Sequence, residues 1–454
     1  MQSRLIVKNF GPLKDIDIEL KNVNVFIGPQ ASGKSALAKL FTIFKAPRKF
    51  LKDFDKDSTI DKSEIYNKAF RDTLEEYNIA SFLREDSEIE FDSKLHRLSF
   101  KQGEIVYIPK MLNKIDELEN LKEDFYSNSS EIQNHLVEFI DNFFLFTLKL
   151  THLLKLENDN FTISLVTIKQ EIRKINKVQF LQIIVLLKES EENLSTNTAL
   201  YIPSERNFSN IIKKYSLNLL NNNVPIPKHI ISFGAELEKV DISEIDLGFL
   251  QNELYYKNIN GDDRIYSKGG SDIKLIEAAS GIQSVLPILL PILNKKILSG
   301  HQSFVIEEPE LNLFPLAQYE LIKLLESKRE DSDSNDNGTI HTYTTHSPYI
   351  LSAINNLLFA SKVRYQLFKS NMYNTSNLEE LSLKSIKMVA KIIDAEIDPS
   401  IFTAYQILNG KAQSIFNEET GLIDENFIDE ASDKIGDDFD ALMELMSESK
   451  HAVK

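Results

Sequence analysis

The chain has 454 residues, and its 68 acidic against 52 basic side chains give it a formal net charge of −16. This balance argues against a protein whose main task is to coat nucleic acid, because such proteins usually carry a basic domain, although a local basic groove stays allowed. Because it has no cysteine, the chain has neither a disulfide framework nor a cysteine-based zinc site, which fits a reducing compartment.

The first elements predicted along the chain are three strands. Residues 4–10 and 15–20 read as strands, the second alternating apolar with acidic residues, and Gly11-Pro12 is the turn between them. The strand pattern follows directly on Met1-Gln2-Ser3, so we expect no signal peptide. The third strand, residues 23–27, leads into a glycine-rich loop.

This loop has the pattern GxxxxGK[ST] and is followed by a helical pattern. A turn of this kind points backbone N–H groups at one spot in front of a helix N terminus, where the helix dipole favours phosphate. Lys34 can reach the β- and γ-phosphates and Ser35 can ligate Mg²⁺, so the loop predicts binding of ATP with Mg²⁺. The predicted nucleotide-binding residues here are Gly28, Pro29, Gln30, Ala31, Ser32, Gly33, Lys34, Ser35 and Ala36.

The length predicts two to three structural units at about 150 residues each, one of them discontinuous. Residues 111–199 carry long amphipathic helical patterns, which we interpret as a helical, coiled-coil-like insertion. The insertion is either a solvated arm or a partner surface, since amphipathic spacing does not say what a face packs against. The nucleotide-binding core would comprise residues 1–110 and 200–360, followed by a mostly helical C-terminal region at 361–454.

The second part of the core is predicted to resume with a strand at residues 199–202. Asn260-Gly261 lies between two strand patterns and is a hairpin signal. A helix opens at Ser280. The apolar run at 285–293 is far shorter than the roughly 20 residues of a membrane span, so we expect a cytoplasmic protein without a membrane partner.

Two later strands end in residues with catalytic potential. Residues 303–306 run into Glu307 and Glu308, and residues 340–343 are followed by His346. A buried strand can fix carboxylates beside the phosphate loop, where Glu307 would hold Mg²⁺ and Glu308 would polarise the attacking water. His346 could hydrogen-bond the γ-phosphate and sense its loss. Each feature alone is more often structural, but their combination with the loop favours catalysis.

The order of these motifs resembles that of the ABC-type ATPases, and more closely the branch shared by SMC proteins, RecF and the overcoming-lysogenization-defect (OLD) family. Residues 279–283 look like the signature motif, 306–315 like the Walker B motif with the D-loop, and 344–348 like the switch histidine. The resemblance implies an ABC-ATPase-like α/β P-loop core with a mixed sheet. It also implies ATP hydrolysis, with the catalytic residues Glu308, His346 and Lys34.

In that group two ATPase heads sandwich two nucleotides. The resemblance implies that Ser280 and Gly281 of one head, with Gln283 beside them, contact the nucleotide held by Lys34 of the other. A second helix N terminus would add hydrogen-bond donors to a charge that one subunit cannot fully satisfy. We therefore expect a homodimer or a higher homo-oligomer.

The sequence departs from the family pattern in three places. Ile282 replaces the second signature glycine, and Glu307 takes the place of the usual Walker B aspartate. The longer side chain leaves open whether the metal is contacted directly or through water. A glutamine loop is not obvious, and the segment 201–206 could replace it by position.

Within the branch, residues 9–12, the Gln30-Ala31 pair and the tail segments 421–424 and 427–429 resemble stand-alone bacterial defence ATPases, such as the ATPase subunits of the PARIS and Septu systems. The resemblance implies a switch that controls a separate nuclease or toxin in anti-phage defence, with DNA or a phage protein as a candidate trigger. The roughly one hundred residues of tail leave little room for a fused nuclease domain.

Two alternatives stay open. One is a RecF- or SMC-like ATPase of DNA repair or maintenance, which would bind DNA with strong salt dependence. The other is a scaffold in which ATP is a structural ligand. The basic residues that the first alternative would use are Arg173, Lys174, Lys177, Lys213 and Lys214.

Overall fold

The computed structural model describes most of the predicted core. The described residues are 3–47, 62–94, 96–110, 132, 136, 179–185, 198–209, 211–212, 222, 224–250, 253–259, 261–267, 269–270, 272–294, 301–329, 339–371 and 378–451. The predicted helical insertion at 111–199 lies almost entirely outside these residues.

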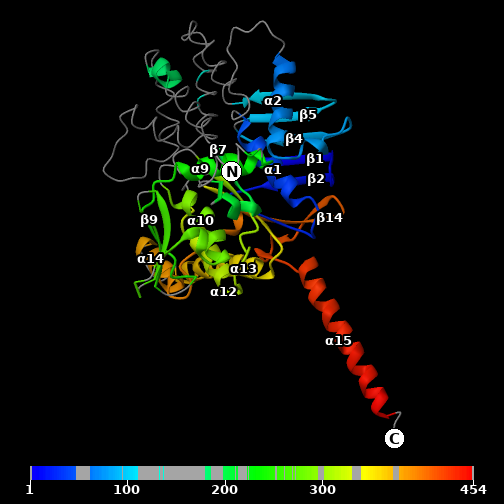
Figure 1. The fold of residues 1–454 in the computed structure, drawn as a ribbon, viewed down its shortest axis with the longest axis vertical. Helices are drawn as coiled ribbons and strands as arrows, with labels where there is room; N and C mark the ends of the chain where they lie inside the picture. Colours follow the sequence, from blue (N-terminus) through cyan, green and yellow to red (C-terminus); the bar gives the residue numbers. More distant parts are fainter. Residues whose placement is uncertain are drawn as a thin grey trace.

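One mixed sheet of eleven strands forms the centre of the molecule, in the order β6-β5-β4-β1-β2-β15-β14-β3-β13-β12-β7 (Figure 1). Its strands are β1 (Ser3–Phe10), β2 (Leu13–Leu20), β3 (Val23–Ile27), β4 (Glu88–Asp92), β5 (His96–Lys101), β6 (Glu104–Pro109), β7 (Thr198–Ile202), β12 (His301–Glu307), β13 (Ile340–Thr345), β14 (Phe402–Leu408) and β15 (Lys411–Ser414).

A parallel block of five strands occupies one half of this sheet. β3 is flanked by β14 and β13, which both run parallel to it, and β12 is parallel to β13 and to β7. All five residues of β3 are buried, as expected for a parallel strand that is covered on both faces. The carboxyl ends of β3, β13, β12 and β7 therefore meet at one edge of the sheet.

Helices cover both faces of the parallel block. Val23, Val25 and Ile27 pack with α10, α12 and α13 on one face, whereas Phe26 packs with α1 and α2 on the other. The helices are α1 (Lys34–Lys45), α2 (Lys62–Glu76), α9 (Lys228–Glu238), α10 (Ser280–Leu293), α12 (Pro315–Ser327), α13 (Pro348–Asn371), α14 (Leu378–Ala390) and α15 (Phe427–His451), with 3₁₀ turns η2 (Ala80–Phe82), η3 (Ser204–Phe208), η4 (Leu275–Glu277) and η6 (Pro399–Ile401).

Two small sheets flank the main one. The larger has the order β11-β10-β9-β8 and contains the predicted hairpin, in which Ile259 of β9 pairs with Asp262 of β10 across Asn260-Gly261. The hairpin prediction is confirmed. The strands are β8 (Glu244–Asp246), β9 (Leu254–Ile259), β10 (Asp262–Ser267) and β11 (Asp272–Lys274) in the first sheet, and β16 (Phe416–Asn417) and β17 (Leu422–Ile423) in the second.

The predicted α/β class is confirmed: a P-loop core is built around a mixed sheet. Two strands of the tail were not predicted. β14 lies between β3 and β15, and β15 joins it to the antiparallel half at β2, so the last hundred residues contribute to the central sheet. The domain boundaries derived from the sequence stay predictions.

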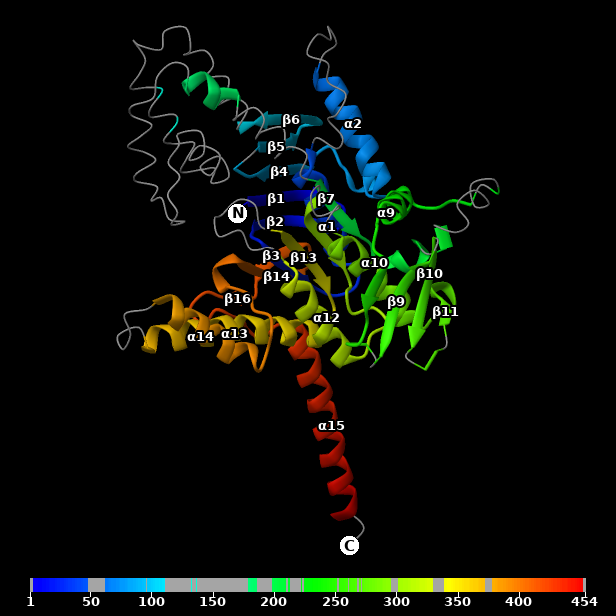
Figure 2. The same ribbon diagram turned by 90° about the vertical axis from the view of Figure 1, so that its left-hand side faces the viewer.

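The chain ends in α15, which extends away from the body in both ribbon views (Figures 1 and 2). Among the described residues, no helix has the length and apolar character that a membrane span requires.

Candidate active site

The site is built at the edge where the parallel strands end. β3 leads into the phosphate loop, β12 ends at Glu307, β13 ends at Thr345 and β7 is followed by η3. In the register of the sheet, Glu307 lies opposite Thr344, and Thr345 lies opposite Ile27. Segments far apart in the sequence are therefore brought together because their strands run in the same direction.

The phosphate loop depends on two glycines. Gly33 occupies the N-cap position of α1 with a φ of 103° and no side-chain cap. A Cβ atom at Gly33 would lie 2.6 Å from Cδ2 of Leu13, and one at Gly28 would lie 2.5 Å from the carbonyl oxygen of Ile407. The first N–H groups of α1 have no intrahelical partner, and the buried Oγ of Ser32 has no hydrogen-bond partner in the part of the chain that the structure describes. These groups are suited to phosphate oxygens.

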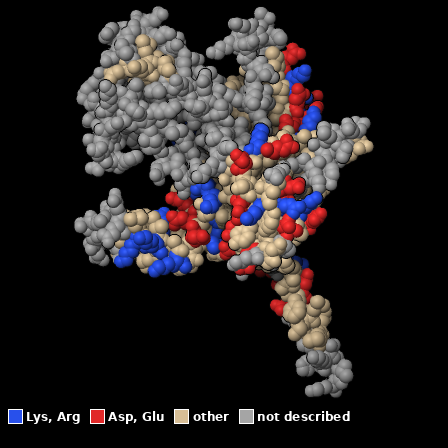
Figure 3. Space-filling view, turned by 60° about the vertical axis from the view of Figure 1, so that its left-hand side comes forward, with Lys and Arg blue, Asp and Glu red and all other residues tan. Residues whose placement is uncertain are grey.

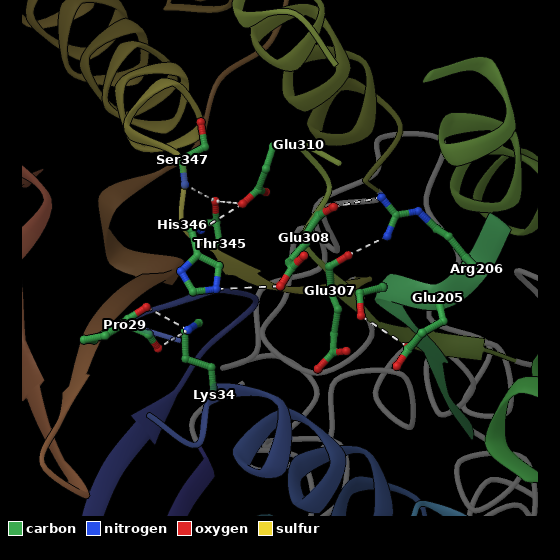
Figure 4. Close-up of polar contacts among 12 residues, drawn as sticks. Pro29, Lys34, Glu205, Arg206, Glu307, Glu308, Glu310, Thr345, His346 and Ser347 are labelled. Atoms are coloured by element: carbon green, nitrogen blue, oxygen red, sulfur yellow. Dashed lines mark hydrogen bonds and ion pairs between the residues drawn. The ribbon is translucent and has the colours of Figure 1, made fainter. Parts of the chain in front are cut away.

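Lys34 is 6% exposed and folds back over the loop. Its Nζ donates to the carbonyl oxygens of Gly28, at 2.7 Å, and Pro29, at 2.9 Å (Figure 4). Burial lowers the pKa of the Lys34 ammonium to about 8, against the opposing effect of nearby carboxylates, of which Glu308 acts most strongly. The lysine is thus held in place but only partly protonated near pH 8.

We expect ATP binding to be linked to proton uptake by Lys34. Because its pKa is about 8 in the free protein and phosphate charge would raise it, affinity should fall as pH rises from 8 to 9.5. Calorimetry at pH 8.5 in buffers of different ionisation enthalpy should detect this uptake in the natural chain. Lys34→Arg, whose guanidinium stays protonated, is the control and should take up no proton; equal uptake by both chains would contradict the prediction.

Glu307 supplies a buried carboxylate next to Ser35. Its side chain is 3% exposed, and its Oε1 has no hydrogen-bond partner among the described residues. Burial raises its pKa, which the neighbouring hydroxyl groups of Tyr201 and Ser35 oppose. A buried carboxylate oxygen without a partner is costly unless a cation or a hydrogen bond compensates it. The carboxylate and the Ser35 hydroxyl are oxygen ligands of the kind that Mg²⁺ prefers, so the two residues would be able to hold this ion.

Glu308 is placed differently from Glu307, although the two are adjacent. Its side chain is about one-third exposed, and its Oε1 lies 3.6 Å from Nε2 of His346. Its backbone has a φ of 43°, in the left-handed region, and its N–H donates to the carbonyl oxygen of Thr344. A non-glycine residue in this region is strained, and such strain concentrates at functional sites. The turn directs Glu308 toward His346 while Glu307 stays buried (Figure 4).

His346 is oriented by Glu310, a residue to which the sequence analysis gave no role. Oε1 of Glu310 accepts hydrogen bonds from Oγ1 of Thr345, at 2.9 Å, and from the backbone N–H of His346, at 2.8 Å. Burial and the nearby Lys34 charge lower the pKa of His346, against the effect of Glu308. The imidazole is therefore mainly neutral near pH 7 and can donate or accept one proton at Nε2.

Arg206 is fully buried, and its hydrogen bonds to the described residues all go to backbone carbonyl oxygens. It donates to Glu307 at 2.7 Å, to Glu308 at 2.8 Å, to Ser284 at 2.8 Å and to Pro203 at 3.2 Å. Burial lowers its pKa to about 10, so it stays charged at neutral pH. It connects η3 to the turn after β12 (Figure 4) and, through Ser284, to α10.

Residues 279–283, which resemble the signature motif, lie at the start of α10 and pack against the turn that follows Glu308. A Cβ atom at Gly281 would lie 2.8 Å from the carbonyl oxygen of Asn312, and Nδ2 of Asn312 donates to Oγ of Ser284. Ser280 is exposed at the helix start, which has no side-chain cap. The Gln283 amide donates to the carbonyl oxygens of Ile276 and Ala278, so it holds the preceding loop.

The structure brings together Lys34, Ser35, Glu307, Glu308 and His346, whereas Gln30 and Ala31 are exposed on the loop. Their roles toward nucleotide stay predictions. Arg206 and Glu310 were missed as positioning residues, although each follows a buried strand that ends at this edge. The candidate DNA-contacting residues Arg173, Lys174, Lys177, Lys213 and Lys214 lie outside the described residues.

Comparison with known proteins identifies one family. The protein-family model that is described as an AAA ATPase domain matches residues 1–351, and no curated protein matches the sequence. The chain is similar to solved SMC head domains. That from Thermotoga maritima is 12% identical, with a TM-score of 0.37, covering 91% of this chain and 98% of its own. One from Pyrococcus furiosus, bound to the C-terminal domain of ScpA, is 10% identical, with a TM-score of 0.35, covering 91% and 95%. At these scores the likeness carries no functional argument.

Proposed function

The chain belongs to the family of AAA ATPase domains, and from this premise we propose that it is an ATP-hydrolysing switch whose heads close in pairs on the nucleotide. The observation that carries the proposal is the convergence of a phosphate loop, a buried carboxylate, a strained glutamate and a histidine at one sheet edge. This is the set of groups that phosphoryl transfer to water requires.

In this proposal, Ser35 and Glu307 would hold Mg²⁺, which would supply positive charge to the phosphate oxygens. Lys34 exchanges its two loop carbonyls for the β- and γ-phosphates. Glu308 orients the attacking water and accepts its proton, because its carboxylate is partly exposed beside His346. His346, fixed through its backbone by Glu310, donates to the γ-phosphate and loses that contact after hydrolysis.

A second copy would complete the site. Ser280 is exposed at the uncapped start of α10, where backbone N–H groups can bind a phosphate held by another subunit. Three large apolar side chains that are close in sequence to the turns of the site are exposed to solvent. They are Phe314 at 84%, Leu316 at 71% and Tyr349 at 51%. Exposed apolar groups of this size favour an interaction surface, and a head-to-head dimer would cover them.

We further propose that pairing of the heads controls a separate effector, a nuclease or a toxin, in bacterial anti-phage defence. What supports this part is the resemblance of the motifs to stand-alone defence ATPases. Inspection of the neighbouring genes tests it, because an adjacent nuclease gene is the expected finding.

The test of the paired site is complementation between two variants. Lys34→Ala removes the phosphate contact of one head, and Ser280→Arg blocks the α10 tip that serves the other. Each variant alone should have no ATPase activity. In a mixture, a mixed dimer contains one site with both residues intact. An equal mixture should therefore recover about a quarter of the natural rate for an isologous pair that exchanges freely.

Two results would contradict the paired site. Full activity of Ser280→Arg alone would mean that α10 does not act on nucleotide. The second result is an equal mixture whose ATPase rate is no higher than the sum of the rates of the two variants, although light scattering detects mixed dimers. This result would mean that all required groups lie in one chain. Ser352→Arg, on the exposed side of α13, is the matched control for the added arginine.

A further inference from the structure

Tyr201 carries a buried hydroxyl group that the proposed mechanism does not use. The residue lies in β7 and is 4% exposed, and its hydroxyl has no hydrogen-bond partner in the described part of the chain. A buried hydroxyl without a partner costs free energy, whereas phenylalanine would fill nearly the same space without that cost. A tyrosine at this position is therefore explained best if its hydroxyl gains a partner in another state of the protein.

Glu307 is the neighbour that can become this partner. In the register of the sheet, Tyr201 lies opposite Val305, and because side chains alternate along a strand, Glu307 lies on the same face as Val305. Burial raises the pKa of Glu307, and the Tyr201 hydroxyl is the strongest of the neighbours that lower it. Oε1 of Glu307 likewise has no hydrogen-bond partner among the described residues. The two side chains are thus close together without a hydrogen bond between them.

The Glu307 carboxylate depends on such a neighbour because water does not solvate it. On the face of the molecule in Figure 3, charged side chains of both signs lie at the surface. The Glu307 side chain is 3% exposed, so its charge can be stabilised only by groups inside the protein and by a bound cation. Arg206 does not hold the carboxylate, since it donates to the backbone carbonyl oxygen of Glu307.

An aromatic cluster fixes the ring of Tyr201. The ring of Tyr77 lies 5.6 Å away and that of His229 5.9 Å away, between ring centroids, and both meet the Tyr201 ring edge to face. Nζ of Lys39, on α1, lies 5.7 Å from the centroid of the Tyr201 ring. Contacts of both kinds are favourable. They hold the hydroxyl beside Glu307.

We propose that Tyr201 is a positioning residue for Glu307, and that in the metal-loaded protein its hydroxyl donates to one oxygen of this carboxylate and leaves the other oxygen for Mg²⁺. Carboxylates that ligate a metal are usually held by such an outer hydrogen bond. A glutamate side chain is long and flexible, so a fixed donor beside it reduces the entropy that ordering the carboxylate costs. The inference rests on the proposed function, because it assigns a role at the same site.

The alternative is that Tyr201 serves packing alone. Its ring carries all of the contacts with Tyr77, His229 and Lys39, so phenylalanine would replace it without any effect on the metal. If Tyr201 positions Glu307, the same substitution removes the donor. In both cases Tyr201→Phe should resist urea at least as well as the natural chain, since the lost hydroxyl forms no hydrogen bond in the free protein.

The experiment measures how much Mg²⁺ strengthens nucleotide binding. Calorimetry gives the Kd of a non-hydrolysable ATP analogue in excess Mg²⁺ and in EDTA, for the natural chain and for Tyr201→Phe. The ratio of the two constants reports the contribution of the metal and requires no hydrolysis. Tyr201→Phe should reduce this ratio about tenfold, whereas its Kd in EDTA should equal that of the natural chain.

Two further variants calibrate the ratio. Tyr77→Phe is the matched control, because it removes a buried hydroxyl from the same cluster and leaves that of Tyr201 in place. It should keep the natural ratio. Ser35→Ala removes a proposed metal ligand and sets the lowest ratio expected.

Three results would overturn the role of Tyr201. They are a natural ratio in Tyr201→Phe, an equal fall in Tyr77→Phe, and a fall in Tyr201→Phe that comes with lower resistance to urea. The last two would assign the effect to packing of the cluster or to the fold. A natural chain whose affinity does not respond to Mg²⁺ would instead overturn the proposed metal site, and the role of Tyr201 with it, so the two failures can be told apart.

Discussion

Glu308→Gln is expected to slow ATP hydrolysis by about 100-fold or more while ATP binding stays close to that of the natural chain. The amide cannot accept the proton of the attacking water. It keeps nearly the shape of the carboxylate, so the turn with its φ of 43° should be retained. Because the groups that hold the phosphates are untouched, the variant should accumulate ATP-bound pairs of heads.

Two measurements check this expectation: single-turnover hydrolysis with labelled ATP, and molecular mass in the presence of ATP. Glu238→Gln is the matched control, since Glu238 is an exposed glutamate at the end of α9 and outside the site, and it should leave the rate unchanged. A Glu308→Gln chain that turns over at the natural rate would remove Glu308 from the mechanism. One that is slow but never pairs would separate hydrolysis from the proposed switch.

Much of the fold could be predicted from local patterns. The alternation at 15–20 predicts the half-exposed strand β2, and α1 follows the glycine-rich loop as the helical pattern there indicates. β14 could not be found in this way. Its place between β3 and β15 depends on pairing over nearly four hundred residues, which periodicity does not encode. Its first three residues are all buried, so this strand lacks the alternation of a half-exposed strand.

The residues of the site that belong to sequence motifs could be predicted, whereas the features that depend on the three-dimensional arrangement could not. The phosphate loop, the paired glutamates and His346 stand out because each comes directly after a strand pattern. The exposure of Glu308 against the burial of Glu307 results from one left-handed residue, and glutamate gives no sequence signal for that conformation. The role of Arg206 depends on carbonyl groups of two other segments, α10 and the turn after β12.

Arg206 leads to the second expectation. Arg206→Lys should lower kcat by about 100-fold with little change in KM, because small displacements of catalytic groups cost about this much. The guanidinium fixes the carbonyl oxygens of both glutamates and ties them to Ser284 of α10. Lysine keeps the charge but lacks the planar set of donors, so the strained turn at Glu308 would lose its anchor. Arg206 thus acts as a positioning residue.

Loss of stability must be separated from loss of positioning, and Arg329 offers the comparison. Its side chain is 1% exposed and pairs with Glu326 at 2.8 Å. Glu326 also contacts His341, which lies near the start of β13. The Arg329–Glu326 pair is therefore at the opposite end of β13 from the site. Breaking a buried charged contact costs about 3–5 kcal/mol, so both Arg206→Lys and Arg329→Lys should unfold at lower urea concentration. At a temperature where both are folded, only Arg206→Lys should lose kcat. Equal losses in the two variants would mean that Arg206 supports the fold alone, whereas a selective loss would mean that the connection from α10 to Glu308 sets the rate of hydrolysis.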